Sequence, residues 1–283
     1  LNTLGGGGKK GNQLIQFGGS LNSISATIVP ILVGYLMGNA ANATISDAAP
    51  ALWIAMGIFA VVFFVLAAVR IPEPFAIQDA KSEKKDKHSA MSFRHFVLGA
   101  VAIFFYVGVE VGIPNTANLY MSNLSWVGPA IAGTMVGVYW FMMMCGRLLG
   151  GALGGKISSR AMLTSVCLLA LVFVFCIMFI PETVKVNVPI VNVHVPLSMV
   201  FMFLCGICTS VMWGSIYNLA AEGLGKYTPA ASGIFMPFIQ NWLADMPSIG
   251  SIGSYWVIVV GILYMLFYAL VGSKNVNKDI PVE

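Results

Sequence analysis

The stretch FFYVGVEVGIPNTANLYM, residues 104–121, places a carboxylate in the middle of an apolar run that is otherwise long enough to cross a lipid bilayer. An ionisable side chain at the centre of a spanning helix is costly unless it faces a cavity or a partner, and Glu110 is such a side chain. Pro114 removes a backbone donor one turn later, which predicts a bent or broken helix. Tyr106, Glu110, Pro114 and Asn118 recur every four residues and therefore share one helix face. We expect this face to look inward, onto water or a solute.

The composition of the whole chain indicates what kind of protein contains this helix. Of the 283 residues, 58% are hydrophobic and only 9% are charged, and the mean hydropathy is +0.85. These values lie outside the range of soluble globular domains and predict an integral membrane protein with many spans. The net charge of +4 requires no nucleic acid as a partner, because basic residues are expected in the cytoplasmic loops of membrane proteins.

Eight apolar blocks follow one another along the chain. They are residues 14–37, 52–71, 96–121, 129–153, 162–180, 197–221, 230–244 and 255–272. The block 230–244 would be about 22 Å long as a helix, which is short of the roughly 30 Å hydrocarbon core. If it crosses, nearly all Lys and Arg residues fall on one side, so the positive-inside rule favours eight crossings with both ends in the cytoplasm. The expected fold class is an all-α, polytopic membrane helix bundle.

A hydrophilic segment, residues 73–94, interrupts the apolar blocks and is rich in Lys, Asp, Glu and Ser. We expect it to be a flexible, solvated cytoplasmic linker. It divides the chain into residues 1–72, with two spans, and residues 95–283, with six. Because transporters are commonly built from repeated halves, this 2+6 arrangement suggests a missing first portion of four spans. The absence of a starting Met agrees with that expectation.

Four stretches carry a resemblance to a known family. They are QFGGSLNSISATIVP at residues 16–30, FYVGVEVGI at 105–113, the Gly-rich 146–151 followed by Lys156 and Arg160, and NLAAEGLGKYTPAASG at 218–233. In that order they resemble the fifth helix, the start of the seventh, the basic loop after the eighth, and the junction of the tenth and eleventh helices of major facilitator superfamily (MFS) transporters. The branch is that of the bacterial fucose–proton and glucose/galactose symporters.

The resemblance implies a partial MFS transporter fold that lacks the first four helices, and with them the usual coupling carboxylates. Gly19 stands where the family pattern has Gln, and residues 237–245 match only the later half of the eleventh helix. By this resemblance the protein is a proton-coupled symporter of a hexose or 6-deoxyhexose such as fucose, glucose or galactose. It would work by alternating access in the bacterial inner membrane, with no cofactor beyond an ion gradient, of H⁺ rather than Na⁺.

Six residues are candidates for binding the sugar. They are Asn22, Glu110, Asn115, Asn118, Trp213 and Gln240. Glu110 is also the candidate for proton coupling, with a neutral, structural acid as the alternative. Asn115 and Asn118 either hold sugar hydroxyls or cap the helix break at Pro114.

Asn22, Gln240 and Trp213 are candidates either because they match family positions or because their side chains suit a sugar. Asn22 and Gln240 match sugar-contacting positions of the family, and interhelical hydrogen bonding is the alternative for Asn22. The indole of Trp213, with Tyr217 one turn further along, can stack on the apolar face of a hexose. Packing against lipid or protein is the alternative for Trp213.

Structural or gating roles are assigned to Arg147, Gly150, Gly151 and Glu222. Arg147 lies a turn or two inside its span, where it either extends to the cytoplasmic surface or pairs with an acid of a neighbouring helix. Glu222 is a candidate for that acid, and a plain interfacial carboxylate is the alternative.

Other chemistries find no support in the sequence. GGGGKK at residues 5–10 lacks the Ser or Thr after Lys that a phosphate-binding loop needs. Cys205 and Cys208 lie inside an apolar run, which favours packing over metal or redox work. We therefore expect no metal site and no enzyme activity.

The partners expected are a small-molecule sugar and membrane lipid, with no nucleic acid, and the protein is expected to be a monomer if the chain is complete. Two alternatives stay open: an MFS carrier of another small solute, and a non-transporting membrane remnant or interaction subunit.

Overall fold

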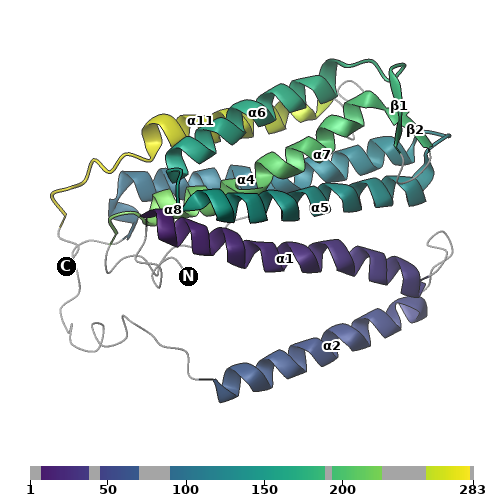
Figure 1. Cartoon of the computed structure of the whole chain (residues 1–283), viewed down its shortest axis with the longest axis horizontal. Helices are drawn as coiled ribbons and strands as arrows, with labels where there is room; N and C mark the ends of the chain where they lie inside the picture. The colour runs from purple at the N-terminus through teal and green to yellow at the C-terminus, as the bar shows by residue number, and fades with distance from the viewer. Residues whose placement is uncertain (1–7, 38–44, 70–89, 189–192, 225–252, 281–283) are drawn as a thin grey trace. The chain divides into compact units, whose positions relative to one another are not determined.

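The computed structural model describes residues 8–37, 45–69, 90–188, 193–224 and 253–280 (Figure 1). The chain divides into two compact units. One comprises Leu1–Ile24 together with His88–Glu283, and the other comprises Ser25–Lys87. Helix α1 (Gly8–Met37) begins in the first unit and ends in the second, which also contains α2 (Ile45–Ala68).

The main bundle, by which we mean the described part of the first unit, is helical apart from one hairpin. Besides the first part of α1, its elements are the 3-10 turn η2 (Ala90–Ser92), α4 (Arg94–Ser122), α5 (Gly128–Gly154), α6 (Ser159–Phe179), β1 (Lys185–Val188), β2 (Val193–Pro196), α7 (Leu197–Ser210), α8 (Met212–Ala221), α11 (Tyr255–Phe267) and the π-helical turn η4 (Tyr268–Gly272). This mostly helical architecture confirms the expected fold class.

Strands β1 and β2 form a small antiparallel hairpin that the sequence analysis did not anticipate. Lys185 pairs with Pro196 and Val188 pairs with Val193, and the hairpin connects α6 to α7. Valine alternates with polar residues in both strands, which is the period-two pattern of β structure. The hairpin is an addition to the all-α description of the bundle.

Six helices within the described residues are long and apolar enough to cross a membrane. They are Ala49–Ala68, Arg94–Ser122, Ile131–Gly154, Ser159–Phe179, Leu197–Ala221 and Tyr255–Gly272. They match six of the eight expected blocks, as a multi-pass membrane protein requires. The first block forms the 30-residue helix α1, which is not among these six. The block 230–244 and most of the expected linker lie outside the described residues.

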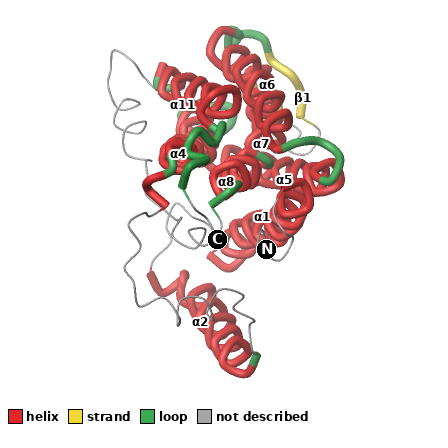
Figure 2. The backbone as a smooth tube through the Cα atoms, turned by 90° about the vertical axis from the view of Figure 1, so that its left-hand side faces the viewer, coloured by secondary structure: helices red, strands yellow, loops and turns green. Residues whose placement is uncertain are grey.

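Helices α7 and α8 are central to the main bundle. Figure 2 shows them among α4, α5 and α6, and between them they contact all three. The close approach of α5 to α7 depends on glycine, because a Cβ atom at Gly206 would collide with the carbonyl oxygen of Tyr139. Gly146 on α5 meets the backbone of Ile207 in the same way. Small residues of this kind let the backbones of two membrane helices pack closely.

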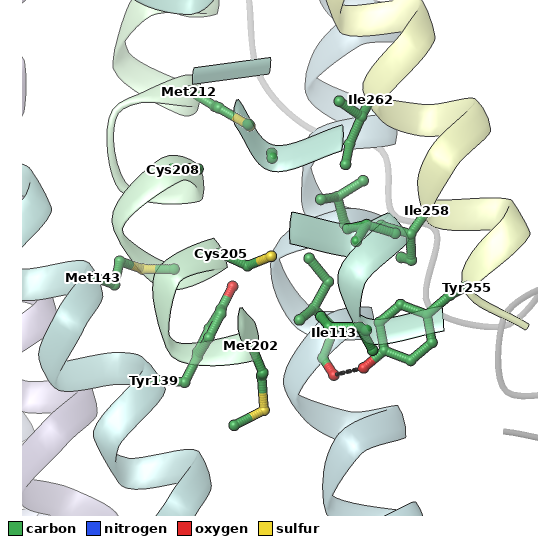
Figure 3. Packing of buried hydrophobic residues seen from close by; sticks show 14 of the residues in the cluster. Ile113, Tyr139, Met143, Met202, Cys205, Cys208, Met212, Tyr255, Ile258 and Ile262 are labelled. Atoms are coloured by element: carbon green, nitrogen blue, oxygen red, sulfur yellow. Dashed lines mark hydrogen bonds between the residues drawn. The ribbon is translucent and has the colours of Figure 1, made fainter. Parts of the chain in front are cut away.

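Apolar side chains of α4, α5, α7, α8 and α11 interlock in one cluster beside these contacts (Figure 3). Ile113 of α4 and Ile258 of α11 belong to it, and the Tyr255 hydroxyl donates to the Ile113 carbonyl at 2.8 Å. Cys205 and Cys208 lie in the same cluster as buried, free thiols, in agreement with the packing interpretation. The cluster gives α4 a face that is closely packed against its neighbours.

Helix α4 continues through Pro114 without interruption, so the broken-helix alternative is wrong. Proline has no backbone N–H, and it therefore leaves the carbonyl of Glu110, four residues earlier, without its helical donor. The hydroxyl of Tyr139 on α5 donates to this carbonyl at 3.0 Å. A side chain from the neighbouring helix thus replaces the missing hydrogen bond, as is common for proline in membrane helices.

Candidate functional site

A cavity of about 530 Å³ lies in the main bundle, where α1, α4, α5, α7 and α8 meet. Its lining residues are Ile15, Gln16, Gly18, Gly19 and Asn22 of α1, Tyr106, Val107 and Glu110 of α4, Arg147 of α5, Ser210 of α7, and Trp213, Gly214 and Tyr217 of α8. The volume falls within the range of small-molecule sites, about 300–1,000 Å³. The structure therefore brings three of the six candidate residues, Asn22, Glu110 and Trp213, to one cavity.

Glu110 and Arg147 form an ion pair on the wall of this cavity. Nη2 of Arg147 lies 3.2 Å from Oε1 of Glu110, and the Arg147 and Glu110 side chains are 10% and 17% exposed. Charges in so sheltered a place are tolerated when they are paired and hydrogen-bonded. The acid that stands out in the stretch 104–121 thus has both a cavity and a partner.

The Arg147 guanidinium also donates hydrogen bonds to two other helices, α1 and α7. Its Nη1 donates to the Gly19 carbonyl at 3.0 Å and to the Ser23 hydroxyl at 2.7 Å, both on α1. Its Nε donates to the Ser210 carbonyl at the end of α7, at 3.3 Å. The planar fork of five donors in arginine suits such a junction, because it can serve several acceptors at fixed angles.

The expected partner acid of Arg147 is corrected by this geometry. Of the two alternatives for Arg147, pairing with an acid of a neighbouring helix is right, but the acid is Glu110 rather than Glu222. The Glu222 side chain is exposed at the end of α8, and its backbone carbonyl accepts a hydrogen bond from Nε2 of His95 at 2.9 Å, with the ring nitrogen as donor. Glu222 is therefore a surface carboxylate, as its alternative interpretation predicted.

Two aromatic rings of α8 provide the flat part of the cavity wall. The rings of Trp213 and Tyr217 are stacked, with centroids 5.3 Å apart and planes inclined by 9°. Trp213 is 40% exposed, so its outer edge is free to meet a ligand or lipid. The stacked pair thus adds an apolar aromatic surface to a cavity that is also lined by polar side chains of α1 and α4.

Asn115 and Asn118 do not line the cavity. Asn115 is exposed and Asn118 is partly buried, on the part of α4 that follows Pro114. Because α4 is unbroken and Tyr139 serves the freed carbonyl, there is no helix break for them to cap, and that alternative is wrong. Gln240 lies outside the described residues.

Gly150 and Gly151 pack α5 against Val211, between α7 and α8, and against α1. A Cβ atom at Gly150 would collide with the Val211 side chain, and one at Gly151 would meet the ring of Phe17 on α1. The space these two glycines leave is filled by other side chains. Their expected structural role fits this packing, whereas the gating part of the expectation stays a prediction.

Asn12 and Gln16 of α1 are buried polar residues that sequence reasoning missed. Asn12, Gln16, Ser20 and Ser23 are all buried. Their spacing of four, four and three residues places them on one helix face. Nε2 of Gln16 donates to the Val211 carbonyl, between α7 and α8, at 3.0 Å. The periodicity was visible in the sequence and could have identified Gln16 as a cavity residue.

Comparison with known proteins places the chain in a family. Residues 13–246 match the family model described as Major Facilitator Superfamily. The chain is 31% identical over 277 residues to a protein of Brucella abortus named "Glucose/galactose transporter", with 90% of this chain and 62% of that protein covered. It is 27% identical over 293 residues to a protein of Helicobacter pylori named "Putative glucose/galactose transporter", with 96% and 69% covered.

The chain thus spans less than two thirds of the length of the Brucella relative. No solved structure matches the chain significantly. The match to the family model covers more than half of the chain and includes every helix that lines the cavity. The chain belongs to the major facilitator superfamily.

Proposed function

We propose that the protein takes part in sugar transport and binds a hexose in the cavity between α1, α4, α5, α7 and α8. One observation carries the proposal. A stacked aromatic pair, Trp213 and Tyr217, lines the same cavity as Asn22 and the Glu110–Arg147 pair. A hexose has an apolar face that suits an aromatic plane and a rim of hydroxyls that suits amide and charged groups. The printed names of the relatives support glucose and galactose as the first substrates to test.

Binding is tested with the full chain reconstituted in lipid nanodiscs. Equilibrium binding of radiolabelled galactose, glucose and fucose is measured for the unaltered protein and for Trp213→Leu. We expect Trp213→Leu to weaken binding by about two- to tenfold, because a lost aromatic stacking contact is worth about 0.5–1.5 kcal/mol. The control is Trp256→Leu, which removes an exposed indole on α11 that does not line the cavity. Equal losses in both variants would contradict the proposed site.

The proposed mechanism is symport by alternating access, with a proton as the coupling ion and Glu110 as the titrating acid. Its support is the sheltered position of Glu110 beside Arg147 on the cavity wall. Proteoliposomes containing the full chain are tested for galactose uptake under an inward proton gradient and, separately, under an inward Na⁺ gradient. We expect acceleration by the proton gradient alone. Galactose binding without uptake under either gradient would instead support a non-transporting membrane component.

The proposed location is the bacterial inner membrane, with both ends of the chain in the cytoplasm. The distribution of Lys and Arg along the chain supports this orientation. An epitope placed at either end should be accessible to antibody only after the inner membrane is permeabilised. Accessibility of one end in intact spheroplasts would overturn the orientation.

A further inference from the structure

The cavity wall carries one positive and one negative side chain, so its net charge is balanced. Among the described residues that line the cavity, Arg147 and Glu110 are the two that carry full charges. They are joined to each other at 3.2 Å. A ligand in this cavity therefore meets one guanidinium whose charge is already compensated by one carboxylate.

The cation of the pair is the more firmly held partner. Arg147 donates to the carbonyls of Gly19 and Ser210 and to the hydroxyl of Ser23, in addition to its contact with Glu110. Three of these four acceptors are uncharged and belong to α1 and α7. The Glu110 side chain could be replaced by an amide while these three bonds still held the guanidinium at the cavity wall.

We propose that Glu110 sets the charge specificity of the cavity, by occupying the Arg147 guanidinium and so favouring uncharged sugars over sugar acids. This inference rests on the proposed sugar function of the cavity. In the unaltered protein, the carboxylate of a hexuronate has to compete with Glu110 for the guanidinium and approaches it against like-charge repulsion. Without the Glu110 charge, the guanidinium is an unpaired cation in a sheltered place, which is unfavourable until an anion binds.

The variant Glu110→Gln tests whether Glu110 sets the charge specificity of the cavity. It keeps the length and shape of the side chain and removes only its charge. We expect galacturonate to bind Glu110→Gln at least about tenfold more tightly than it binds the unaltered protein, because charge-assisted arginine–carboxylate bonds are about twice as strong as neutral ones. The uncharged methyl ester of galacturonate should show no such gain.

Two further variants separate the charge effect from a loss of folding. Glu222→Gln makes the same chemical change at an exposed acid outside the cavity and should leave all three affinities unchanged. The double variant Glu110→Gln with Arg147→Met removes both charges and should lose the gained galacturonate affinity. Size-exclusion profiles and thermal melting with and without galacturonate show whether each variant is folded. Galacturonate should raise the melting temperature of Glu110→Gln and leave that of the unaltered protein unchanged.

The experiment measures equilibrium binding of galactose, galacturonate and its methyl ester to the full chain in nanodiscs. A selective gain for galacturonate in Glu110→Gln supports the inference. It is overturned if the acid and its ester gain equally, or if the ratio of galacturonate to galactose affinity does not change. A failure of the sugar proposal has a different signature, since galactose would then bind neither the unaltered protein nor Glu222→Gln.

Discussion

Helix α4 has one face that lines a polar cavity and another that is packed in an apolar cluster, within a few residues of each other. Glu110 faces the cavity and is held by a guanidinium, whereas Val109 and Ile113 are buried in the apolar cluster shared with α5, α7 and α11. The cavity face is held by an ion pair between specific side chains, and the other face is held by close packing of apolar side chains. A substitution on the first face should therefore affect binding and charge, and one on the second should affect stability alone.

Loss of the cation should have the largest effect. Arg147→Met removes four hydrogen bonds and leaves Glu110 without its partner. Breaking one side of a sheltered ion pair costs about 3–5 kcal/mol, and we expect sugar binding to be abolished as well. Reversible unfolding in mixed micelles measures the stability. The control is Arg160→Met, which removes a single 3.3 Å bond to Ser273, and a similar loss there would contradict the central position of Arg147.

Truncation on the packed face should be the next largest effect, and it should leave binding intact. Ile113→Ala opens a cavity in the apolar cluster, for which we expect a loss of about 2–4 kcal/mol in unfolding free energy. Val101→Ala, on an exposed part of the same helix, should cost much less. If Ile113→Ala weakened galactose binding as strongly as Trp213→Leu does, the two faces would not be independent.

The Tyr139 hydroxyl donates to the backbone of α4 at Glu110, and its removal should cause an intermediate loss of unfolding free energy. Tyr139→Phe leaves the Glu110 carbonyl without a donor, because Pro114 supplies none, and should cost about 1–2 kcal/mol. Tyr255→Phe is the matched control, since the Ile113 carbonyl to which Tyr255 donates keeps the helical N–H of Ala117. The Tyr255→Phe loss should be the smaller one.

A double-mutant cycle makes the Tyr139 test specific. Pro114→Ala restores the backbone N–H that serves the Glu110 carbonyl, so Tyr139→Phe should cost less in that background than in the unaltered chain. An unchanged cost would show that the hydroxyl acts through another contact, such as its 3.0 Å hydrogen bond with Thr209.

The smallest effect should come from Gly151, the glycine of α5 that meets the exposed ring of Phe17 on α1. Gly151→Ala directs a methyl group at the ring of Phe17, which is exposed and can turn aside, so a loss of about 1 kcal/mol is expected. Gly137→Ala on the same helix meets no atom within 4 Å and should stabilise the protein slightly through helix propensity. Thermal melting of the two variants in the same detergent measures the difference, and equal shifts would argue against the packing of α1 on α5.

Much of the architecture could be predicted because hydropathy and length identify membrane spans directly. Six of the eight predicted blocks are helices that can span, and the inward position of Glu110 followed from the cost of a charge in lipid. Helix α1 was also predicted as an apolar block, but the buried Asn12 and Gln16 on it were not. The alternation of Val in the hairpin was visible in the sequence but is short and follows a strongly apolar span.

The partners in the site could not be predicted because they come from other helices. Nothing near Pro114 in sequence indicates that Tyr139, a residue of the next helix, would donate to the Glu110 carbonyl. Arg147 had more than one acid within reach of a plausible bundle, and only the packing of α4 on α5 selects Glu110 over Glu222. Asn115 and Asn118 share the sequence neighbourhood of Glu110 but lie beyond the cavity along α4.

The most direct test of a wetted cavity beside Glu110 compares two valines of α4. Val107 lines the cavity, whereas Val109 is buried in the apolar cluster. In a background with the five native cysteines replaced, Val107→Cys and Val109→Cys are exposed in nanodiscs to a charged, water-soluble thiol reagent. We expect rapid modification of Val107→Cys, slowed by galactose, and no modification of Val109→Cys. Modification of Val109→Cys with Val107→Cys protected would contradict the account.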